Sequence, residues 1–480
     1  MAKKKLKGNG IHFLGKASDD VTGSQYLVKF NNVQCLLECG LYQSQSNDFL
    51  DSYKINSAKF KFNPVEIDYV FVAHPHIDHC GLLPRLVKYG FCGKIIATDK
   101  TIEIMKPLLL NSCAIIADEA RVLSKRYHRE YEPLYSEEDV YETFRLFEPY
   151  SDYNRLYFLC DTIGFQFLRN SHCIGAAQIQ LVLSDGDHIK RVLYTSDIGG
   201  IHTDNHYVSE TEIPNMFNDV VIMESTYGDK SRMTKKTRKF DLEHLKCAVN
   251  TVLERGGTVI LPCFSFSRTQ EVLTELYMLF GKDSAFTTPV VVDSKLSCDI
   301  SNLYNKILTN TDFELWNEVC SWQNLRFISD KSESANMVAT NIPKIIISSS
   351  GFCTNGRVVA YLRKYLQDPN SMIIFSGYTG DNDSYLSYRI KNYRGHKYIS
   401  VQKEKILNRA DCITLSTFSS HAGHDDLIKY GSSLHTNKLV LVHGSSDSKK
   451  CLAEELTCAI SDNDKTYRVM SAYSGMIVGL

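Results

Sequence analysis

Short apolar runs recur along the chain and alternate with segments whose apolar residues follow helical spacing. The runs are rich in branched and aromatic residues and are bounded by polar or glycine-containing stretches, a pattern that predicts strands. They lie at 25–30, 33–38, 69–73, 178–183, 192–196, 219–224, 258–262, 344–348, 372–376 and 438–443. A helix is predicted over 240–255, with Leu245, Val249, Val252 and Leu253 on one stripe and a glycine pair after it. This alternation predicts an α/β protein with layered sheets.

The 480 residues exceed what one hydrophobic core usually serves, so we expect two domains or one domain with a large insertion. The composition, with 43% hydrophobic residues and a formal net charge of -1, is that of an ordinary soluble globular protein. A nucleic-acid partner would therefore have to be attracted by a local basic patch. Residues 230–239 include six lysines or arginines, which fit either a solvated surface or a nucleic-acid contact.

The chain opens with no signal-peptide pattern and holds no apolar run long enough to span a bilayer, so no membrane contact is expected. Its 15 cysteines are scattered, odd in number and form no C-x-x-C pair. This usage predicts reduced thiols in the cytoplasm rather than a disulfide framework or a cysteine-ligated zinc.

The densest chemical signal is the run His74-Pro75-His76-Ile77-Asp78-His79, which places four candidate metal ligands in six positions. Imidazole nitrogens and carboxylate oxygens are suitable ligands for zinc. Because side chains alternate along an extended chain, His74 and His76 can point the same way, while Asp78 and His79 are free to serve a neighbouring ion. The run therefore predicts ligands for two adjacent metals.

Two metal positions need further ligands, and three residues at strand ends are candidates. His172 is followed by small residues that let the backbone pass close to a metal, Asp197 follows the run 192–196, and His443 closes the run 438–443. The carboxylate of Asp197 can bridge two ions through its two oxygens. Each signal is weak alone, because strand-end residues of these types are more often caps or turns. Together, in this order, they complete two zinc sites.

With further segments, these ligands resemble the metallo-β-lactamase superfamily and, more narrowly, its β-CASP branch of nucleic-acid-processing nucleases. The run 74–79 matches the H-x-H-x-D-H signature of the superfamily. The segments that resemble motifs of the branch are Glu224-Ser225-Thr226-Tyr227-Gly228, Ser419-Ser420-His421-Ala422, Val442-His443-Gly444, an arginine-containing helix start at 264–271 and a glycine-rich turn at 349–357. The resemblance spans nearly the whole chain.

The resemblance implies an α/β fold, namely a four-layer αβ/βα metallo-β-lactamase sandwich with an inserted α/β β-CASP domain. Residues 1–228 and 414–480 would form the sandwich, and 229–413 the insertion. The implied cofactors are two Zn²⁺ ions, with Mn²⁺ as an alternative. One ion would be held by His74, His76 and His172 and the other by Asp78, His79 and His443, with Asp197 bridging them.

The resemblance also implies the chemistry. Bound zinc lowers the pKa of a shared water and holds a phosphodiester for in-line attack. His421 matches the family's proton donor to the leaving sugar oxygen, and Glu224 would orient it, so Asp78, Glu224 and His421 are the expected catalytic residues. Arg268 and Arg357 are candidate phosphate contacts, with an interdomain salt bridge as the equal alternative.

Some positions depart from the family pattern. Glu38 stands where an aspartate is usual, at a position that normally contacts a metal ligand rather than the metal, so a slight shift of metal orientation is expected. Gly423 and the segment 377–383 also differ, which affects substrate detail rather than catalysis. His424 matches no family role and is expected at the surface.

The expected function is a zinc-dependent ribonuclease that cleaves RNA endonucleolytically, with 5′–3′ exonuclease activity left open beside it. In the branch, histidine in the third motif, as at His443, is associated with RNA rather than DNA. A DNA nuclease and a non-catalytic RNA-processing scaffold are the alternatives, and a small-molecule hydrolase would leave Glu224 and His421 unexplained. The chain ends soon after His443, so a minimal, bacterial-type enzyme is expected. The oligomeric state is open, and a homodimer is compatible with the sequence.

Overall fold

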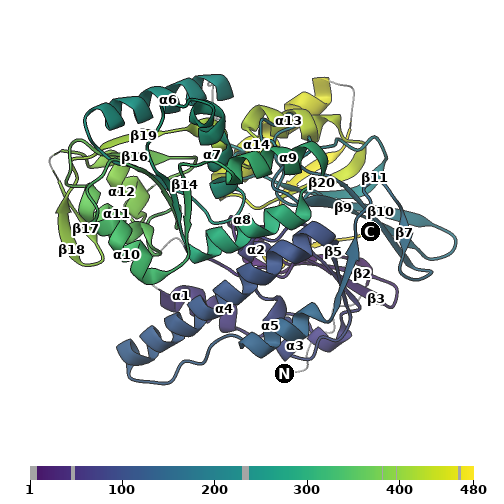
Figure 1. Ribbon diagram of the computed structural model, residues 1–480. Coiled ribbons are helices and arrows are strands. Elements are labelled where there is room, and N and C mark those ends of the chain that lie inside the picture. Colours follow the sequence, from purple (N-terminus) through teal and green to yellow (C-terminus); the bar gives the residue numbers. More distant parts are fainter. Residues whose placement is uncertain (1–7, 45–48, 230–236, 381, 396, 463–465) are drawn as a thin grey trace.

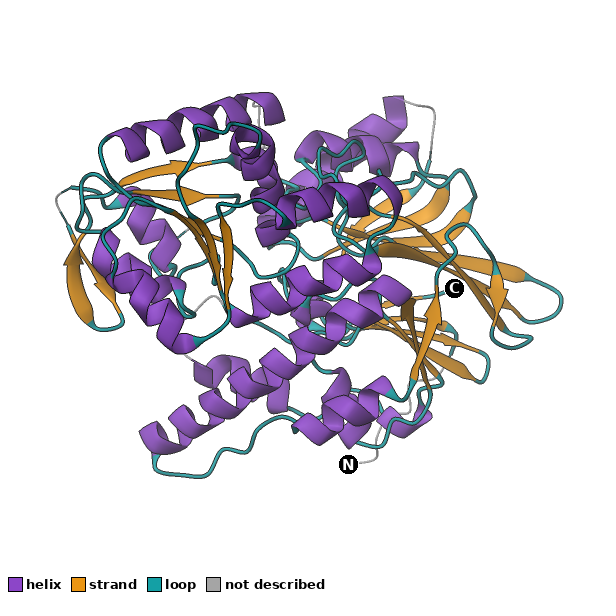
Figure 2. Ribbon diagram, in the orientation of Figure 1, coloured by secondary structure: helices purple, strands orange, loops and turns teal. Residues whose placement is uncertain are grey.

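The computed structural model describes residues 8–44, 49–229, 237–380, 382–395, 397–462 and 466–480. Within them, two seven-stranded sheets and one six-stranded sheet carry helices on their outer faces (Figures 1 and 2). The basic stretch predicted at 230–239 lies outside the described residues except for its last three positions. No helix of the described part combines the length and the apolar character needed to cross a membrane.

The two seven-stranded sheets face each other across one apolar core. Alternate side chains of their strands point inward, for example Phe13 and Phe71 from one sheet and Phe165 and Ile222 from the other. The helices α3 (Leu83–Lys88), α4 (Asp99–Tyr127) and α5 (Glu137–Phe144) cover the outer face of the first sheet, and α13 (His424–Ser433) and α14 (Ser446–Asp462) cover that of the second. This order of layers confirms the predicted four-layer sandwich.

The first sheet has the order β22 (Ile477–Val478), β1 (Gly10–Phe13), β2 (Tyr26–Phe30), β3 (Val33–Leu37), β4 (Tyr69–Phe71), β5 (Lys94–Thr98) and β6 (Phe147–Tyr150). The second has the order β21 (Arg468–Ser471), β20 (Thr436–Val442), β11 (Asn218–Glu224), β10 (Ile189–Tyr194), β9 (Ala177–Ser184), β8 (Ile163–Arg169) and β7 (Tyr157–Phe158). Their helices are α1 (Phe49–Ser57), α2 (Ile77–Cys80), α3 (Leu83–Lys88), α4 (Asp99–Tyr127), α5 (Glu137–Phe144), α13 (His424–Ser433) and α14 (Ser446–Asp462).

The six-stranded sheet belongs to the inserted α/β domain. All its pairings are parallel, and its order is β14 (Leu325–Ile328), β13 (Val290–Asp293), β15 (Ile345–Ser348), β12 (Val259–Pro262), β16 (Met372–Phe375) and β19 (Asp411–Thr414). Parallel strands of this kind are buried on both faces and read as continuous apolar runs. The last strand ends one residue beyond the boundary expected at 413.

Helices pack on both faces of this parallel sheet. One face carries α6 (Arg238–Glu254), α7 (Arg268–Leu276), α8 (Lys295–Ile307) and α9 (Asn310–Cys320). The other carries α10 (Lys331–Ala339), α11 (Val358–Tyr365) and α12 (Leu386–Asn392), beside the hairpin β17 (Tyr398–Val401) and β18 (Glu404–Leu407). The helix predicted over 240–255 is α6, which begins two residues earlier because Thr237 caps its N-terminus.

The inserted domain shares a core with the sandwich. Ile104 and Leu108 of α4, together with Tyr207 from the loop between β10 and β11, lie in the same apolar cluster as Leu245 and Trp316 of the insertion. Figure 1 shows α4 and α8 side by side where the two domains meet. The insertion is therefore packed against the sandwich through apolar surface close to the candidate ligand His172.

Candidate active site

Four strands of the second sandwich sheet end at one edge, and a candidate site residue stands at each end. β10, β11 and β20 are parallel neighbours, and β8 runs in the same direction because two antiparallel pairings separate it from β10. His172 follows β8, Asp197 follows β10, Glu224 ends β11 and His443 follows β20. Shared strand direction thus brings together residues that lie far apart in the chain.

The run from His74 to His79 reaches this edge from the first sheet. It leaves β4 and forms α2, and the loop after β3 holds its backbone. The Cys39 N–H donates to the His79 carbonyl at 2.8 Å, and the Leu41 N–H donates to the Ile77 carbonyl at 3.0 Å. The side chains of His74 and His79 are fully buried.

The seven predicted metal ligands gather in two groups. Within each group the candidate ligand atoms lie within 4.8 Å of one another. The first group comprises His74, His76 and His172, and the second comprises Asp78, His79, Asp197 and His443. The structure therefore brings the seven candidate ligands together, and their division between two ions stays a prediction.

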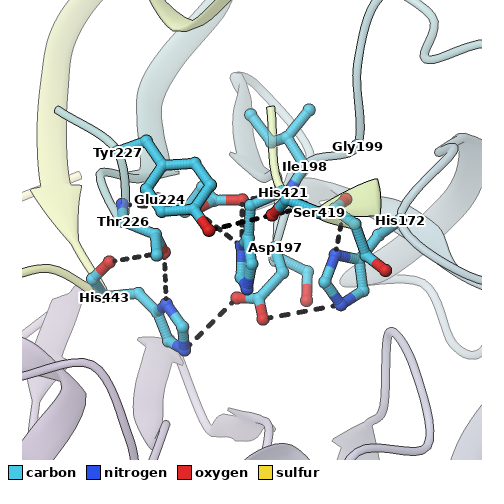
Figure 3. Close-up of polar contacts among 12 residues, drawn as sticks. His172, Asp197, Ile198, Gly199, Glu224, Thr226, Tyr227, Ser419, His421 and His443 are labelled. Carbon is cyan, nitrogen blue, oxygen red and sulfur yellow. Dashed lines mark hydrogen bonds and ion pairs between the residues drawn. The ribbon is translucent and has the colours of Figure 1, made fainter. Parts of the chain in front are cut away.

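Asp197 lies between the two groups, as Figure 3 shows for its contacts with His172 and His443. Its Oδ2 is 3.8 Å from Nε2 of His74 and from Nε2 of His172. Its Oδ1 is 3.3 Å from Nε2 of His79 and 3.4 Å from Nε2 of His443. Each oxygen faces a different group, which is the arrangement that a bridging carboxylate needs.

The second ring nitrogen of several ligands is held by a neighbour. Nδ1 of His74 is 3.1 Å from Ser196 Oγ, and Nδ1 of His443 is 3.0 Å from Thr226 Oγ1. Nδ1 of His172 lies 3.2 Å from the carbonyl oxygen of Ser420, which can only accept, so this nitrogen carries the proton. Its Nε2 therefore keeps a lone pair toward the site, as metal-binding histidines require.

Glu38 contacts the Nδ1 side of the His79 ring. Its Oε1 lies 3.4 Å from His79 Nδ1 and accepts a hydrogen bond from the Ala73 N–H at 3.2 Å. Ser196 Oγ is 3.4 Å from the same oxygen, so Glu38 also reaches the partner of His74. The longer glutamate therefore lies beside the candidate ligand His79.

Buried polar atoms without partners test whether a cation fits. In the described part of the chain, Nε2 of His74, Nε2 of His79 and Oδ1 of Asp197 are buried and have no hydrogen-bond partner. Leaving such groups unpaired costs about 1–3 kcal/mol each. All three lie among nitrogen and oxygen atoms that can ligate a metal, so the residues present suit a metal ion.

The protonation states of the candidate ligands also favour a bound cation. Burial lowers the pKa of His76 to about 4 and that of His74 and His172 well below the usual value, which keeps these rings neutral. Burial would raise the pKa of Asp197, but His443 and His79 hold it well below its usual range. His79 differs, because Asp197 and Asp78 outweigh burial and raise its pKa well above the usual value, so this ring has to give up a proton when it binds a cation.

His421 stands at the rim of the ligand groups and is paired with Glu224. Its Nδ1 lies 3.1 and 3.2 Å from the two carboxylate oxygens, and Glu224 is only 1% exposed (Figure 3). Burial lowers the pKa of His421, but Glu224 and, more weakly, Asp197 and Asp78 outweigh it and raise this pKa to about 9. The ring therefore carries a proton at neutral pH.

Three non-glycine residues beside the ligands have left-handed backbones. Glu38, Ser196 and His443 have φ values of 62°, 56° and 51°. Each follows a strand, where the chain turns sharply into a site loop. Such conformations cost about 1–3 kcal/mol each and persist where the surroundings impose them, commonly at functional sites.

The inserted domain reaches the site through the turn before α7. The Phe266 ring lies 5.6 Å from the His76 ring, and Arg268 Nη2 donates to Ser420 Oγ at 3.1 Å. Arg268 also pairs with Glu271 at 2.7 Å, within its own helix. Arg268 is thus next to the His421 segment, and its contact with phosphate stays a prediction.

Arg357 lies within the inserted domain. Its guanidinium pairs with Asp293 at 2.7 Å and donates to the carbonyl oxygens of Ile328, at 3.1 Å, and Ser329. The ion pairs of both arginines are inside one domain, so the alternative of an interdomain salt bridge is wrong for each. Contact between Arg357 and phosphate also stays a prediction.

Some supporting residues were not singled out by the sequence. Asn170 binds both ligand loops: its Nδ2 donates to the Asp197 carbonyl at 2.7 Å, and its Oδ1 accepts from the His172 N–H at 3.0 Å. Its place two residues before His172 was the available signal.

The expectation that His424 lies at the surface is wrong, because it is 2% exposed and pairs with Glu455 at 2.9 Å.

Two adjacent ligand groups sharing one carboxylate, at the edge of an αβ/βα sandwich, define a metal-dependent hydrolase. Three family models match this chain: the metallo-beta-lactamase superfamily over residues 19–112, the Beta-Casp domain over 269–383, and the Zn-dependent metallo-hydrolase RNA specificity domain over 408–468. Together they match more than half of the chain. The chain belongs to the β-CASP branch of the metallo-β-lactamase superfamily, which confirms the predicted family.

Relatives that align with most of this chain support this placement. Ribonuclease TTHA0252 of Thermus thermophilus is 27% identical over 92% of this chain and 94% of its own length. An RNase J-like protein of Methanocaldococcus jannaschii is 28% identical over 87% of this chain and 88% of its own. Transcription termination factor FttA of Methanothermobacter thermautotrophicus is 25% identical over 96% and 72%.

One solved structure also matches along the whole chain. It is a protein of unknown function from Enterococcus faecalis, with a TM-score of 0.54 at 14% identity, and the match covers 99% of this chain and 100% of that one. At this identity the likeness concerns the fold.

Proposed function

We propose that this protein is a ribonuclease that hydrolyses RNA phosphodiester bonds with two bound Zn²⁺ ions and with His421 as the proton donor. The observation that carries the proposal is the position of Asp197, whose two oxygens face separate ligand groups beside the His421–Glu224 pair. RNA as the substrate has two supports. One matching family model describes an RNA specificity domain, and two relatives are named as a ribonuclease and an RNase J-like protein.

In this proposal His74, His76 and His172 would hold one ion, Asp78, His79 and His443 would hold the other, and Asp197 would serve both. Bound metal would lower the pKa of a water and withdraw charge from the phosphate. Proton transfer to the leaving group would depend on side chains of the protein.

The leaving sugar oxygen needs a proton when the P–O bond breaks. Glu224 occupies Nδ1 of His421, so the other ring nitrogen is the one available to a substrate. Glu224 also stabilises the charged imidazolium. General acid catalysis of this kind is worth about 10²–10⁴ in rate.

The test compares RNA and DNA strands of one sequence, each with and without a chelator. Asp78→Ala and His421→Ala are expected to abolish RNA cleavage in proteins with unchanged circular dichroism. Asp204→Ala and His188→Ala, which alter exposed residues of the same types, are the matched controls and should cleave normally. Wild-type cleavage by either site variant, or equal cleavage of DNA, would contradict the proposal.

Metal analysis of the purified protein tests the cofactor, with two zinc ions per chain as the expected result and reconstitution with Mn²⁺ as the comparison. Cleavage of a circular RNA tests the endonucleolytic mode, since a circle has no end, and 5′-monophosphorylated linear RNA tests 5′–3′ exonuclease activity.

Cytoplasmic localisation and homodimer formation stay predictions. All fifteen cysteines lie in the described part and none forms a disulfide, as a reducing compartment allows. Sedimentation of the purified protein tests the homodimer.

A further inference from the structure

The segment that delivers His421 crosses from one domain to the other. It leaves β19, the last strand of the inserted sheet, turns through a short 3₁₀ helix at Ser416–Phe418, and then enters α13 of the sandwich. The position of His421 therefore depends on how this crossing is held. We call residues 416–421 the crossing segment.

Asp241, in the first turn of α6, holds the crossing segment by its backbone and its side chain. One of its carboxylate oxygens, Oδ2, accepts from the Thr417 N–H and from the Thr417 hydroxyl, both at 2.9 Å. Asp241 is fully buried, so water does not compete for these bonds. Hydrogen bonds to a charged group are worth about 1.5–3 kcal/mol.

Arg238, one turn earlier in α6, holds the next residue. Its guanidinium carbon lies 3.4 Å from the centre of the Phe418 ring, a stacked cation–π contact. Nη2 pairs with Glu271 at 2.8 Å and with Glu275 at 2.9 Å, both in α7. Arg238 is 7% exposed, and its two carboxylate partners fix the plane of the guanidinium against the ring.

The contacts continue to the active site. Glu271 also pairs with Arg268, which donates to Ser420 Oγ at 3.1 Å. The Ser420 carbonyl accepts from Nδ1 of the ligand His172 at 3.2 Å, and His421 is the next residue. A continuous series of contacts thus runs from the first turn of α6 to the proton donor.

We propose that Arg238 and Asp241 are positioning residues for the reaction, which hold the crossing segment so that His421 stands beside the leaving oxygen. The inference rests on the proposed role of His421 as proton donor. Neither residue is placed to touch the substrate. The inserted domain therefore completes the catalytic site by fixing the segment that carries its acid.

A leaving-group experiment separates positioning from general stability. RNAs of one sequence are compared in pairs, one with the ordinary scissile linkage and one with sulfur in place of a bridging oxygen. A thiol ionises near pH 8.5, so a thiolate leaves with little help from an acid. Sulfur is placed at each bridging position in turn, since either oxygen can be the one that leaves.

Asp241→Ala is expected to lower kcat on the oxygen-linked RNA by about 10²-fold, the cost of a small misplacement of a catalytic group. Cleavage of the sulfur-linked RNA, KM and metal content should stay close to wild type. Asp241→Asn, which keeps the shape and removes the charge, should show a smaller selective loss. Arg238→Lys, which cannot stack and fork as arginine does, should behave like Asp241→Ala.

Two controls and one reference complete the design. Glu243→Ala removes an exposed carboxylate from the same helix, and Ser334→Ala removes a buried hydrogen bond to Asp293 elsewhere in the inserted domain. Neither should discriminate between the two RNAs. His421→Ala must discriminate between them, and its failure to do so would overturn both the proton donor and the positioning proposal.

The positioning proposal alone fails if His421→Ala discriminates but the soluble Asp241 and Arg238 variants do not. An equal loss on both RNAs would assign the two residues a merely structural role. Thermal unfolding of each variant identifies any that does not fold, and Asp241→Asn then carries the test.

Discussion

At the scale of single residues, Glu224 shows how one buried carboxylate serves several groups. Its oxygens accept from the Ile198 N–H and, at 3.2 Å, from the Thr226 N–H, while both face Nδ1 of His421. With 1% exposure, its charge acts with little solvent screening. Glu224 therefore anchors the loop after Asp197 and holds His421, the proposed proton donor.

Glu224→Gln keeps the shape of this side chain and removes its charge. The carboxylate is the main influence that raises the pKa of His421 to about 9, so its loss lowers that pKa. An acid must be protonated to act, and wild-type cleavage should decline as pH rises through about 9. In the variant, the decline in kcat/KM is expected about 1–3 pH units lower, measured between pH 5 and 10.

The control is Glu210→Gln, since Glu210 also pairs with a histidine, His202 at 2.9 Å, but at the exposed surface. This variant should keep the wild-type profile. An unchanged alkaline limb in Glu224→Gln would remove Glu224 from its proposed role.

At the scale of elements, close packing of the loop after β3 against helix α2 positions part of the candidate metal site. Gly40, after β3, lies against α2, and a methyl group added to it would stand 1.6 Å from the Asp78 carbonyl oxygen. That atom is backbone and cannot swing aside. Only glycine lets the β3 loop approach the ligand-bearing segment this closely.

Gly40→Ala is therefore expected to push α2 away and displace Asp78 and His79. We expect a loss of about 1–3 kcal/mol in the free energy of unfolding, as for other overpacked sites. Bound metal should also be lost more readily during dialysis against a chelator.

Gly479→Ala is the control, because a methyl group there meets no atom within 4 Å. Denaturant titration and metal analysis should leave it unchanged. Normal metal retention by Gly40→Ala would show that the loop adapts.

Two helices show which elements the local sequence pattern could predict. The apolar stripe of α6 was predicted, because its spacing is regular. The 29-residue helix α4 was not, and it contains Pro107, which removes a backbone donor. Burial of Met105 and Leu109 against the first sheet stabilises it, and this contact is tertiary.

At the scale of the whole molecule, the loop between β10 and β11 ties the sandwich to the insertion. The Tyr207 hydroxyl lies 2.6 Å from Thr274 Oγ1, and the ring packs 5.8 Å from that of Trp316. His206 pairs with Glu275 at 3.6 Å, the same carboxylate that binds Arg238. This contact makes the joint between the domains sensitive to pH.

Glu275, 3.6 Å away, raises the pKa of His206, against burial and the nearby Arg238. A raised pKa contributes stability below the unfolded value of about 6.5, and this is lost as pH rises through the folded value. His206→Gln is therefore expected to destabilise the protein by about 0.5–1 kcal/mol at pH 5.5 and hardly at all at pH 9.

Denaturant unfolding of wild type and variant at both pH values measures this difference. Other histidines titrate equally in the two proteins and cancel in the comparison. A loss that is larger at pH 9 than at pH 5.5 would contradict the assignment. His188→Gln, at an exposed position, is the control.

The sequence by itself determined ten of the strands, the candidate ligands and the family, because short apolar runs and a dense His/Asp run are local properties. Only the tertiary structure decided that the two oxygens of Asp197 face separate ligand groups, since this depends on four strands that end at one edge. It also decided which residues hold His421 in place. Thr417 and Asp241 are 176 positions apart, and no local pattern pairs them. Contacts of that range form only when the inserted domain packs onto the sandwich.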